Sequence, residues 1–511
     1  MRLLAALLLL PQCLSLNILF FLLGTNQFER NTFEFLAQQL ALRHHNVITV
    51  KPVLIPEEPR LVKPKLHLVH EKTLKNLLSR ELSDELQRAG DVIPWKEGYE
   101  EEAYDEVYWK AHNLSCYKMI NSNLLDSLKK EAIDVVVVYS GNPCQLFLAH
   151  VLAVPVIYYD LEGLSDETLV SSNTPLNLNI PPSHCFLPEI KQPILQRLRN
   201  GICYMKEYLI QSEVPLISRL ISKKFRQLDE PIGTMFAEDY NFKKIFESFP
   251  SSSALMRSSA FFFANTDPLL EFPRALSPRI VPVGGVHIDA PRPLFSVKAI
   301  LGALSKLTNY RIYWRIGHQV QLVGVNEADV PSHINLTAFF PQNDLLAHKS
   351  CKLLVTNGGM SSLMEAVAHG VPVVGIPLYG SNRHNLRKVV AKGLGVVVTK
   401  DELREEKLLT AMKSVLQGSR YATVAKEMSK EFRRRSTSPF ETVLHYIELV
   451  GHHRGAAFFG DKPQHPLSTL NLDFFVIMLA VLSYFYRRKK KEKRLIFHEF
   501  AEEILRSSTL S

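Results

Sequence analysis

The sequence has few cysteines, and none of them is arranged to bind a metal. No two of the six have the spacing of a zinc-binding pair, and none has a histidine partner at such a spacing, so a metal site is not expected. Cys13 lies in a hydrophobic N-terminal segment, and the five others cannot all pair, so the sequence does not predict a disulfide scaffold. Repeats and low-complexity tracts are also absent, which with 46% hydrophobic residues excludes a disordered or fibrous chain.

A general excess of positive charge is missing as well. The formal net charge is +9, but Arg487–Arg494 holds seven basic residues and one acid, net +6, which leaves +3 for the other 503 residues. Nucleic-acid-binding domains gather basic residues on one face of the fold or along a helix. The sequence therefore does not support a nucleic-acid partner, and its basicity belongs to a C-terminal tail.

The chain has 511 residues, enough for two or three domains. Its N-terminus has the composition of a secretory signal. Residues 1–15 contain one basic residue, an apolar run, and small residues three and one positions before Leu16. This layout is typical of a signal peptide removed before Leu16. The alternative is a first buried strand, although a separate strand is predicted at 17–23.

The C-terminal end predicts a membrane anchor at 470–486. It contains the uncharged run Phe474–Tyr486, which ends in aromatic residues and is followed by the basic tail 487–511. That order is typical of a transmembrane helix with its basic end in the cytosol. The run is short for a span, and a buried core helix is the alternative. Signal and anchor together predict a single-pass type I protein with lumenal domains, in which the sequons at Asn113 and Asn335 would be glycosylated.

Strands and helices alternate in two halves between these ends. In the first half, 16–264, buried-strand runs alternate with amphipathic helical stretches, which predicts an α/β fold with a parallel sheet covered on both faces. A proline-rich linker, 265–294, leads to a second half of the same class, 295–469. The strand candidates are 17–23, 47–50, 134–139, 154–159, 311–315, 353–356 and 371–376.

A glycine pair marks the most informative part of the sequence. A strand leads through Gly358 and Gly359 into a helix expected at 363–369, with Ser361-Ser362 as its candidate caps. A glycine turn at a helix N-terminus is an anion site, because free N–H groups and the helix dipole point outward. Phosphate is the natural ligand of such a turn.

Three further residues would complete a nucleotide-sugar cradle. Glu365 would accept hydrogen bonds from sugar hydroxyls, while Phe339 and Gln342 would stack on and hydrogen bond to a base. The alternative is an ordinary strand–helix crossover, which the glycine pair alone would favour. The spacing of the whole block, 339–385, favours the nucleotide-sugar cradle instead. It resembles the donor-binding signature of the UDP-glycosyltransferases, in particular the membrane-bound UDP-glucuronosyltransferases.

The resemblance extends over most of residues 1–494. It includes the linker motifs that start at Asn265 and Pro282, the segment that starts at Ser438, and the anchor with its basic tail. It implies a GT-B fold, in which two Rossmann-like domains face each other across a cleft. It also implies that the first domain binds a lipophilic acceptor and the second a UDP-sugar as co-substrate, without a cofactor, and that transfer to an acceptor hydroxyl inverts the sugar.

The sequence departs from the family pattern at the two catalytic positions. Alignment with the family places Glu29 where the base histidine is expected, and Tyr139 where an acid would orient that histidine. A carboxylate with a pKa near ~4.3 is poorly matched to a hydroxyl proton at neutral pH. The alternative for Glu29 is an exposed loop carboxylate paired with Arg30 or Arg43.

The donor signature is only partly kept. Asn357 replaces a histidine that contacts phosphate, and Ser361 replaces an asparagine. Ser381 and Asn382 stand where an acid and a glutamine meet the sugar hydroxyls. The positions that keep the family residue are Phe339, Gln342, Gly358, Gly359, Ser362 and Glu365.

A larger difference follows Leu294. The family has a strand, a Ser-Phe-Gly-Ser loop and a helix there, whereas this chain passes from Phe295 through a helical stretch to the strand at 311–315. About 30 residues, the size of a strand–loop–helix unit, are absent. We expect the second sheet to lack its leading strand and the phosphate site to lack one wall.

These observations predict a glycosyltransferase of the endoplasmic reticulum membrane that moves a sugar, glucuronic acid in the family pattern, from a UDP-sugar to a small lipophilic acceptor. The alternative is a catalytically impaired relative that binds lipophiles or pairs with active family members, which the substituted base, helper and donor positions favour. Homo- or hetero-oligomers with relatives are a further expectation. The region 54–230 carries no motif that identifies the acceptor.

Overall fold

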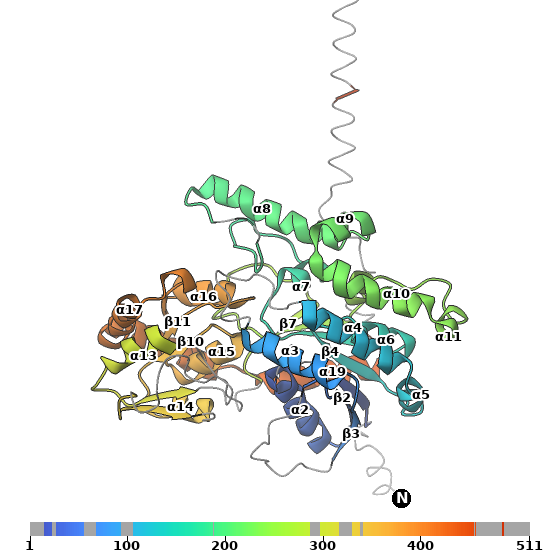
Figure 1. Cartoon of the computed structure of the whole chain (residues 1–511), viewed down its shortest axis with the longest axis horizontal. Helices are drawn as coiled ribbons and strands as arrows, with labels where there is room; N and C mark the ends of the chain where they lie inside the picture. Colours follow the sequence, from blue (N-terminus) through green and yellow to red (C-terminus); the bar gives the residue numbers. More distant parts are fainter. Residues whose placement is uncertain are drawn as a thin grey trace, which may run out of the picture. The chain divides into compact units, whose positions relative to one another are not determined.

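The computed structural model describes residues 15–22, 27–55, 68–92, 106–185, 187, 189–286, 297–315, 330–337, 341–453, 455 and 483–484. The chain separates into two compact units, Met1–Asp461 and Lys462–Ser511, and almost all described residues belong to the first. That first unit is an α/β structure built on parallel sheets (Figure 1).

The larger sheet has seven parallel strands in the order β3-β2-β1-β4-β5-β6-β7. Its central strands are runs of β-branched and aromatic residues, which suit a pleated surface that is buried on both faces. β4, for example, is buried along its whole length. The strands are β1 (Asn17–Phe21), β2 (Asn46–Pro52), β3 (Val69–Leu74), β4 (Val135–Tyr139), β5 (Val156–Asp160), β6 (Phe261–Ala264) and β7 (Ile280–Pro282).

Helices connect β1 to β2, β3 to β4, β4 to β5 and β5 to β6, and pack on the sheet. α2 shows why: its apolar residues Phe33, Leu36, Ala37 and Leu40 recur at helical spacing and are all buried. The helices of this part are α2 (Gln27–Leu42), α3 (Arg80–Val92), α4 (Glu106–Ile120), α5 (Leu124–Lys129), α6 (Cys144–Val151), α7 (Asp166–Ser171), α8 (Pro193–Ile210), α9 (Pro215–Ile221), the π-helix η3 (Phe225–Asp229), α10 (Glu230–Glu238), α11 (Tyr240–Lys243) and α12 (Ser252–Arg257).

This half has the predicted alternation of strands and helices, with two differences that affect the predicted site and linker. α2 begins at Gln27, so Glu29 lies in the first turn of a helix and not in a loop. β7 lies inside the segment predicted as a linker, where it pairs with β6 and completes the sheet. The prolines of that segment did not prevent a strand, because Pro282 is the last residue of an edge strand.

The strands of the second half form two separate sheets. Within the described residues β8 pairs with β9 alone, β10, β11 and β12 form a three-stranded sheet, and no strand joins β8 to β10. This division agrees with the expected loss of a leading strand. The elements are α13 (Val297–Ser305), β8 (Ile312–Arg315), β9 (Ile334–Thr337), α14 (Gln342–Ala347), β10 (Leu354–Thr356), α15 (Met360–His369), β11 (Val373–Gly375), α16 (Asn382–Ala391), β12 (Gly395–Val397), the 3-10 helix η5 (Lys400–Glu402), α17 (Glu405–Gln417), α18 (Ser419–Arg433) and α19 (Pro439–His452).

The last helix, α19, returns to the first sheet. Its residues Val443, Leu444, Ile447 and Val450 belong to the same buried cluster as β1 and β4. Ser438 caps the helix by accepting a hydrogen bond from the Glu441 N–H. The C-terminal helix therefore packs on the N-terminal half, although 156 residues of chain, 283–438, lie between β7 and its start.

Two disulfides crosslink the first half. Cys116–Cys144 joins α4 to the start of α6, and Cys185–Cys203 joins the loop after α7 to α8. Cys351 is free. The sequence predicts one odd cysteine but not these two bonds, because their partners are 28 and 18 residues apart and meet only through tertiary packing.

The two predicted ends lie largely outside the described residues. This applies to the signal peptide apart from Ser15, and to the anchor at 470–486 apart from residues 483 and 484. Within the described part of the chain, no helix is long and apolar enough to cross a membrane. The signal peptide and the anchor therefore remain predictions.

Candidate functional site

The centre of the site is the turn between β10 and α15. The Thr356 hydroxyl accepts a hydrogen bond from the Gly358 N–H (3.3 Å), and the Asn357 side-chain oxygen accepts one from the Gly359 N–H (3.3 Å). Asn357, which occupies the predicted phosphate position, therefore shapes the turn itself.

The two glycines of the turn have different roles. Gly358 has φ +93°, and a Cβ there would lie 2.4 Å from the Leu386 side chain, so only glycine fits. Gly359 has an ordinary φ of −58°, and the nearest atom to a Cβ there would be Asn357 Oδ1 at 3.7 Å. The space over Gly359 is thus open, as a site for an incoming phosphate requires.

α15 begins earlier than the sequence predicts. Its N-cap is Gly359 and its first residue is Met360, so the prediction that Ser361 or Ser362 caps the helix is wrong. The helix begins directly after Gly359, so both serines lie inside its first turn. The N-terminal N–H groups of α15 are free of a side-chain cap, and its first turn contains no acid. Both features favour an anion.

Three of the predicted donor residues meet beside this helix. The side-chain amide of Gln342, in α14, donates to the Ser362 hydroxyl (3.1 Å) and to Glu365 Oε2 (2.7 Å). Gln342 and Glu365 are both buried. Phe339, predicted to stack on the base, lies outside the described residues.

Hydrogen bonds also connect the turn and the start of α15 with the first half of the chain. The Asn385 amide, in α16, donates to the carbonyls of Glu162 and Gly358, at 3.2 Å each. The Asn265 amide donates to the Leu161 carbonyl (2.9 Å) and approaches the Ser361 hydroxyl (3.4 Å). We call these contacts, together with the ion pair described next, the seam between the halves.

A buried ion pair completes the seam. Lys388 Nζ lies 2.7 Å from Glu271 Oε2, and the two side chains are 0% and 6% exposed. Burial would raise the pKa of Glu271, but Lys388 outweighs it and holds that pKa below its usual value. Thr266 donates to the same carboxylate (3.1 Å). No local pattern in the sequence indicates this pair, because the two residues are 117 positions apart.

The predicted sugar-binding residues lie at the start of α16. Ser381 is the N-cap, and Asn382 is buried with its side-chain Nδ2 without a hydrogen-bond partner among the described residues. His384, two residues on, is buried, and burial with the cations Lys388 and Arg274 lowers its pKa well below the usual value. The imidazole is therefore neutral at physiological pH.

Of the two catalytic candidates, Tyr139 ends the strand β4 and Glu29 lies in the helix α2. Tyr139 ends β4, is 2% exposed, and packs edge-on against Phe33 of α2, with ring centres 6.1 Å apart. Glu29 lies one helical turn before Phe33 on the same face of α2; its side chain is outside the described residues. Tyr139 thus ends β4, and Glu29 lies in the helix that follows β1, the strand paired with β4.

A carboxyl that the sequence did not single out lies at the end of β5, the strand next to β4. Asp160 ends β5 and is fully buried; its Oδ2 accepts bonds from the Ser165 N–H (2.9 Å) and the Thr168 hydroxyl (2.7 Å). Its Oδ1 has no partner among the described residues. Burial raises the pKa of Asp160 to about 6 against these hydrogen bonds. That value suits a proton acceptor at neutral pH, but the burial separates it from solvent.

A small polar cavity lies beside Tyr139. It has a volume of about 20 Å³ and is lined by residues that include Tyr139, Asn142 and Tyr158, with the charged side chains of Glu167, Lys224 and Asp229. This volume holds about one water molecule. The cavity is therefore too small for an acceptor molecule in this conformation.

The two predicted glycosylation sites have different surroundings. Asn335 is exposed on β9, whereas Asn113 is half-buried in α4 and its amide nitrogen donates to the Gln227 carbonyl (2.7 Å). No group of three or more metal-binding side chains gathers within the described part of the chain.

Comparisons with known sequences find glycosyltransferases. A family model described as "UDP-glucoronosyl and UDP-glucosyl transferase" matches residues 296–503. The Homo sapiens 2-hydroxyacylsphingosine 1-beta-galactosyltransferase is 27% identical over 412 residues, which cover 73% of this chain and 70% of that protein. The Bos taurus UDP-glucuronosyltransferase 3A1 is 28% identical over 399 residues, 70% of each chain.

Solved glycosyltransferase structures share the fold. The Phytolacca americana UGT2, complexed with UDP-2fluoro-glucose and pterostilbene, superposes with a TM-score of 0.56 at 14% identity, over 86% of this chain and 100% of that one. The glycotransferase of kitacinnamycin gives a TM-score of 0.53 at 13% identity, over 85% and 99%. At these identities the likeness concerns the fold alone, which is of the GT-B type.

The ion pair of the seam generates a first prediction. Glu271→Gln leaves Lys388 buried without a counter-charge, so we expect it to lower the free energy of unfolding by about 3–5 kcal/mol. The matched control is Glu402→Gln, which breaks an exposed pair with Lys407 and should change the free energy of unfolding far less, because water screens exposed pairs. Denaturant unfolding of the full chain in detergent measures both, and an equal small loss for the two variants would contradict the role of the pair.

Asp160 generates a second prediction, on pH. Because its pKa is about 6 in the folded chain and 3.8 without the fold, the unfolded chain loses the proton first as the pH rises. The contribution of protonated Asp160 to the free energy of unfolding is therefore complete below pH 4, and it is lost as the pH passes through 6. Relative to Asp160→Asn, the wild type should lose about 3 kcal/mol between those limits. A difference in unfolding free energy that does not change with pH would contradict this assignment.

Proposed function

We propose that this chain is a UDP-sugar glycosyltransferase that moves glucuronic acid to a hydroxyl of a small lipophilic acceptor, as its similarity to UDP-glycosyltransferases supports. The single observation that carries the proposal is the open N-terminus of α15. There the free N–H groups after Gly358 and Gly359 lie next to Gln342, Ser362 and Glu365.

In the proposed reaction the donor pyrophosphate binds at this helix N-terminus. The acceptor oxygen attacks C1 of the sugar, the bond between C1 and the β-phosphate oxygen breaks, and UDP leaves with the negative charge. The N–H groups at the start of α15 stabilise that charge where it develops. The Gln342 amide holds the Glu365 carboxylate in place, so that its oxygens are directed to sugar hydroxyls.

The start of α16 supports glucuronic acid as the sugar. The first turn of α16 contains no acid, and Ser381 and Asn382 are both neutral. The partial positive charge of a helix N-terminus favours the carboxylate of such a sugar. The named relatives include galactosyl- and glucuronosyltransferases, so UDP-galactose and UDP-glucose are the competing donors.

Proton removal is the weak step of the proposed reaction. Glu29 and Tyr139 replace the base and its orienting acid, and general-base help is typically worth roughly 10²–10⁴-fold in rate. Transfer would therefore be slow. The burial of the Tyr139 ring against Phe33 favours, as the second candidate, a chain that binds lipophiles or pairs with relatives without transferring sugar.

The proposed location is the lumen of the endoplasmic reticulum, with a single-pass anchor at 470–486 and the basic tail in the cytosol. The two disulfides support it, because such bonds persist in oxidising compartments and are rare in the cytosol. Glycosylation at the exposed Asn335 belongs to the same proposal.

Blocking the open space over Gly359 tests the donor site. We expect Gly359→Val to weaken binding of UDP by about tenfold or more, about 1.4 kcal/mol, because its side chain occupies the place of a phosphate. The fold should lose less than about 1 kcal/mol, since the backbone there suits any residue. Equilibrium binding of labelled UDP-glucuronate to the full chain, with UDP, UDP-glucose and UDP-galactose as competitors, measures the effect.

The matched control is Gly201→Val, in α8, where a Cβ would meet only Leu178 at 3.8 Å. It should leave UDP binding unchanged. Equal affinity for UDP in the Gly359→Val variant and the wild type would contradict the assignment of the turn. Absence of binding by a folded wild-type chain would contradict the transferase itself.

A further inference from the structure

Large apolar side chains are exposed on two helices of the first half. Among the described residues, half of all exposed large hydrophobic side chains lie between residues 190 and 220, on or beside α8 and α9. Scattered single exposed hydrophobics are ordinary, but a contiguous patch marks an interaction surface. The patch consists of Ile190, Ile194, Leu195, Leu198, Ile202, Val214, Leu216 and Leu220, and we call it the α8–α9 patch.

The exposed residues of α8 form one stripe. Ile194, Leu198 and Ile202 follow one another at intervals of four residues, which places them on one face of the helix. Ile194 is 82% exposed and Leu198 62%. The opposite face is polar or cysteine-containing and buried, with Arg199, Asn200 and Cys203. This is the reverse of a helix that packs on a soluble core, where the apolar stripe faces inward.

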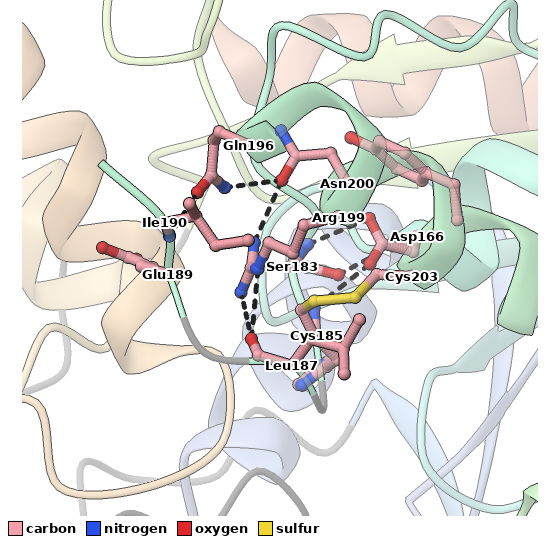
Figure 2. Close-up of a disulfide and its surroundings, with 12 residues drawn as sticks. Asp166, Ser183, Cys185, Leu187, Glu189, Ile190, Gln196, Arg199, Asn200 and Cys203 are labelled. Atoms are coloured by element: carbon pink, nitrogen blue, oxygen red, sulfur yellow. Dashed lines mark hydrogen bonds between the residues drawn. A yellow bond between two sulfur atoms is a disulfide. The ribbon is translucent and has the colours of Figure 1, made fainter. Parts of the chain in front are cut away.

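The buried face of α8 is fixed, so the helix cannot turn its apolar stripe inward. Figure 2 shows the disulfide from Cys203 to Cys185, with Arg199 and Asn200 beside it. The Arg199 guanidinium donates to the Leu187 carbonyl (3.1 and 2.7 Å) and to Asn200 (3.0 Å). A covalent bond and buried hydrogen bonds therefore hold the stripe toward the outside.

α9 has the same inverted pattern and contacts α8 (Figure 1). Its polar Ser218 is fully buried and donates to the Ile210 carbonyl (2.8 Å), whereas Leu216 and Leu220, four residues apart, are 67% and 76% exposed. Two adjacent helices thus expose leucine and isoleucine and bury polar groups. The same inverted pattern thus occurs in two helices that contact each other.

The charges around the patch are positive. Lys191, Arg197 and Lys223 are exposed and form no ion pair with any described residue. The exposed acids of the same stretch are neutralised, because Glu189 pairs with Arg387 and Glu213 with Arg257. Apolar residues flanked by unpaired cations are the composition of a helix that lies in the surface of an anionic bilayer.

We propose that the α8–α9 patch inserts into the lipid headgroup region of an anionic membrane. The apolar stripes would enter the boundary of the acyl chains, and the three free cations would contact the lipid phosphates. This proposal does not rest on sugar transfer or on the predicted anchor. It would place the first half against the bilayer, from which lipophilic molecules can partition.

Site-specific fluorescence of the full chain in vesicles tests the proposal. Cys351, the one free cysteine of the described residues, is replaced by serine, and an environment-sensitive probe is attached through Leu198→Cys or Leu220→Cys. Both positions are highly exposed, so the substitutions should not affect folding. The matched control is Tyr240→Cys on α11, which is 71% exposed and outside the patch. The vesicles contain phosphatidylcholine and phosphatidylglycerol, with or without lipids that carry a quenching label.

We expect labelled lipids to quench probes at 198 and 220 about twofold or more, and the probe at 240 far less. Lys191→Glu, Arg197→Glu and Lys223→Glu together, or vesicles without phosphatidylglycerol, should reduce the quenching at 198. Equal quenching at 198 and 240 would overturn the proposal. A second result would also overturn it: no quenching of the probe at 198 by labelled lipid, together with a fluorescence that changes with the protein-to-lipid ratio. A second copy of the chain would then cover the patch.

Discussion

The ion pair between Glu271 and Lys388 is the constraint on which the candidate site depends. It is fully enclosed, so neither charge can lose its partner without a large penalty. Glu271 follows β6 in the predicted linker, and Lys388 lies in α16, beside the donor turn. The pair therefore fixes the distance between the first sheet and the helix whose Leu386 side chain presses on Gly358. We therefore expect the turn before α15 to keep its geometry only while this seam holds.

Several residues that differ from the family pattern belong to the seam or the turn. Ser361 faces the Asn265 amide, Asn357 accepts the Gly359 N–H, and Ser381 stands at the N-cap position of α16 without a side-chain cap bond. On the proposed function, these substitutions keep the shape of the turn but remove groups expected to contact a bound sugar or phosphate. The site has kept its backbone better than its side chains, which fits donor binding with slow transfer. A bilayer contact at the α8–α9 patch would add a supply of lipophilic molecules to the same half of the chain.

The sequence predicted the parts of the structure that depend on local pattern. Buried β-branched runs gave β1, β4 and β5, and the glycine pair gave the turn before α15. β3 alternates exposed and half-buried residues, so it could not be distinguished from a loop. The Glu271–Lys388 pair and both disulfides were missed because their partners are 117, 28 and 18 positions apart. Asp160 was missed because its raised pKa comes from burial, which the local pattern does not show. The inverted helices α8 and α9 were missed because periodicity shows that a stripe exists, but not whether it faces the core or the outside.

Sugar transfer by the full chain in membranes is the most direct test of the account. The chain is incubated with small lipophilic alcohols and phenols and, in parallel, with UDP-glucuronate, UDP-glucose or UDP-galactose, and mass spectrometry detects the conjugates. The account predicts a conjugate that carries one glucuronate, formed slowly, with the other two donors giving less product. A chain that binds UDP but forms no conjugate from any of the three donors would contradict it, and would leave a binding protein built on a transferase fold.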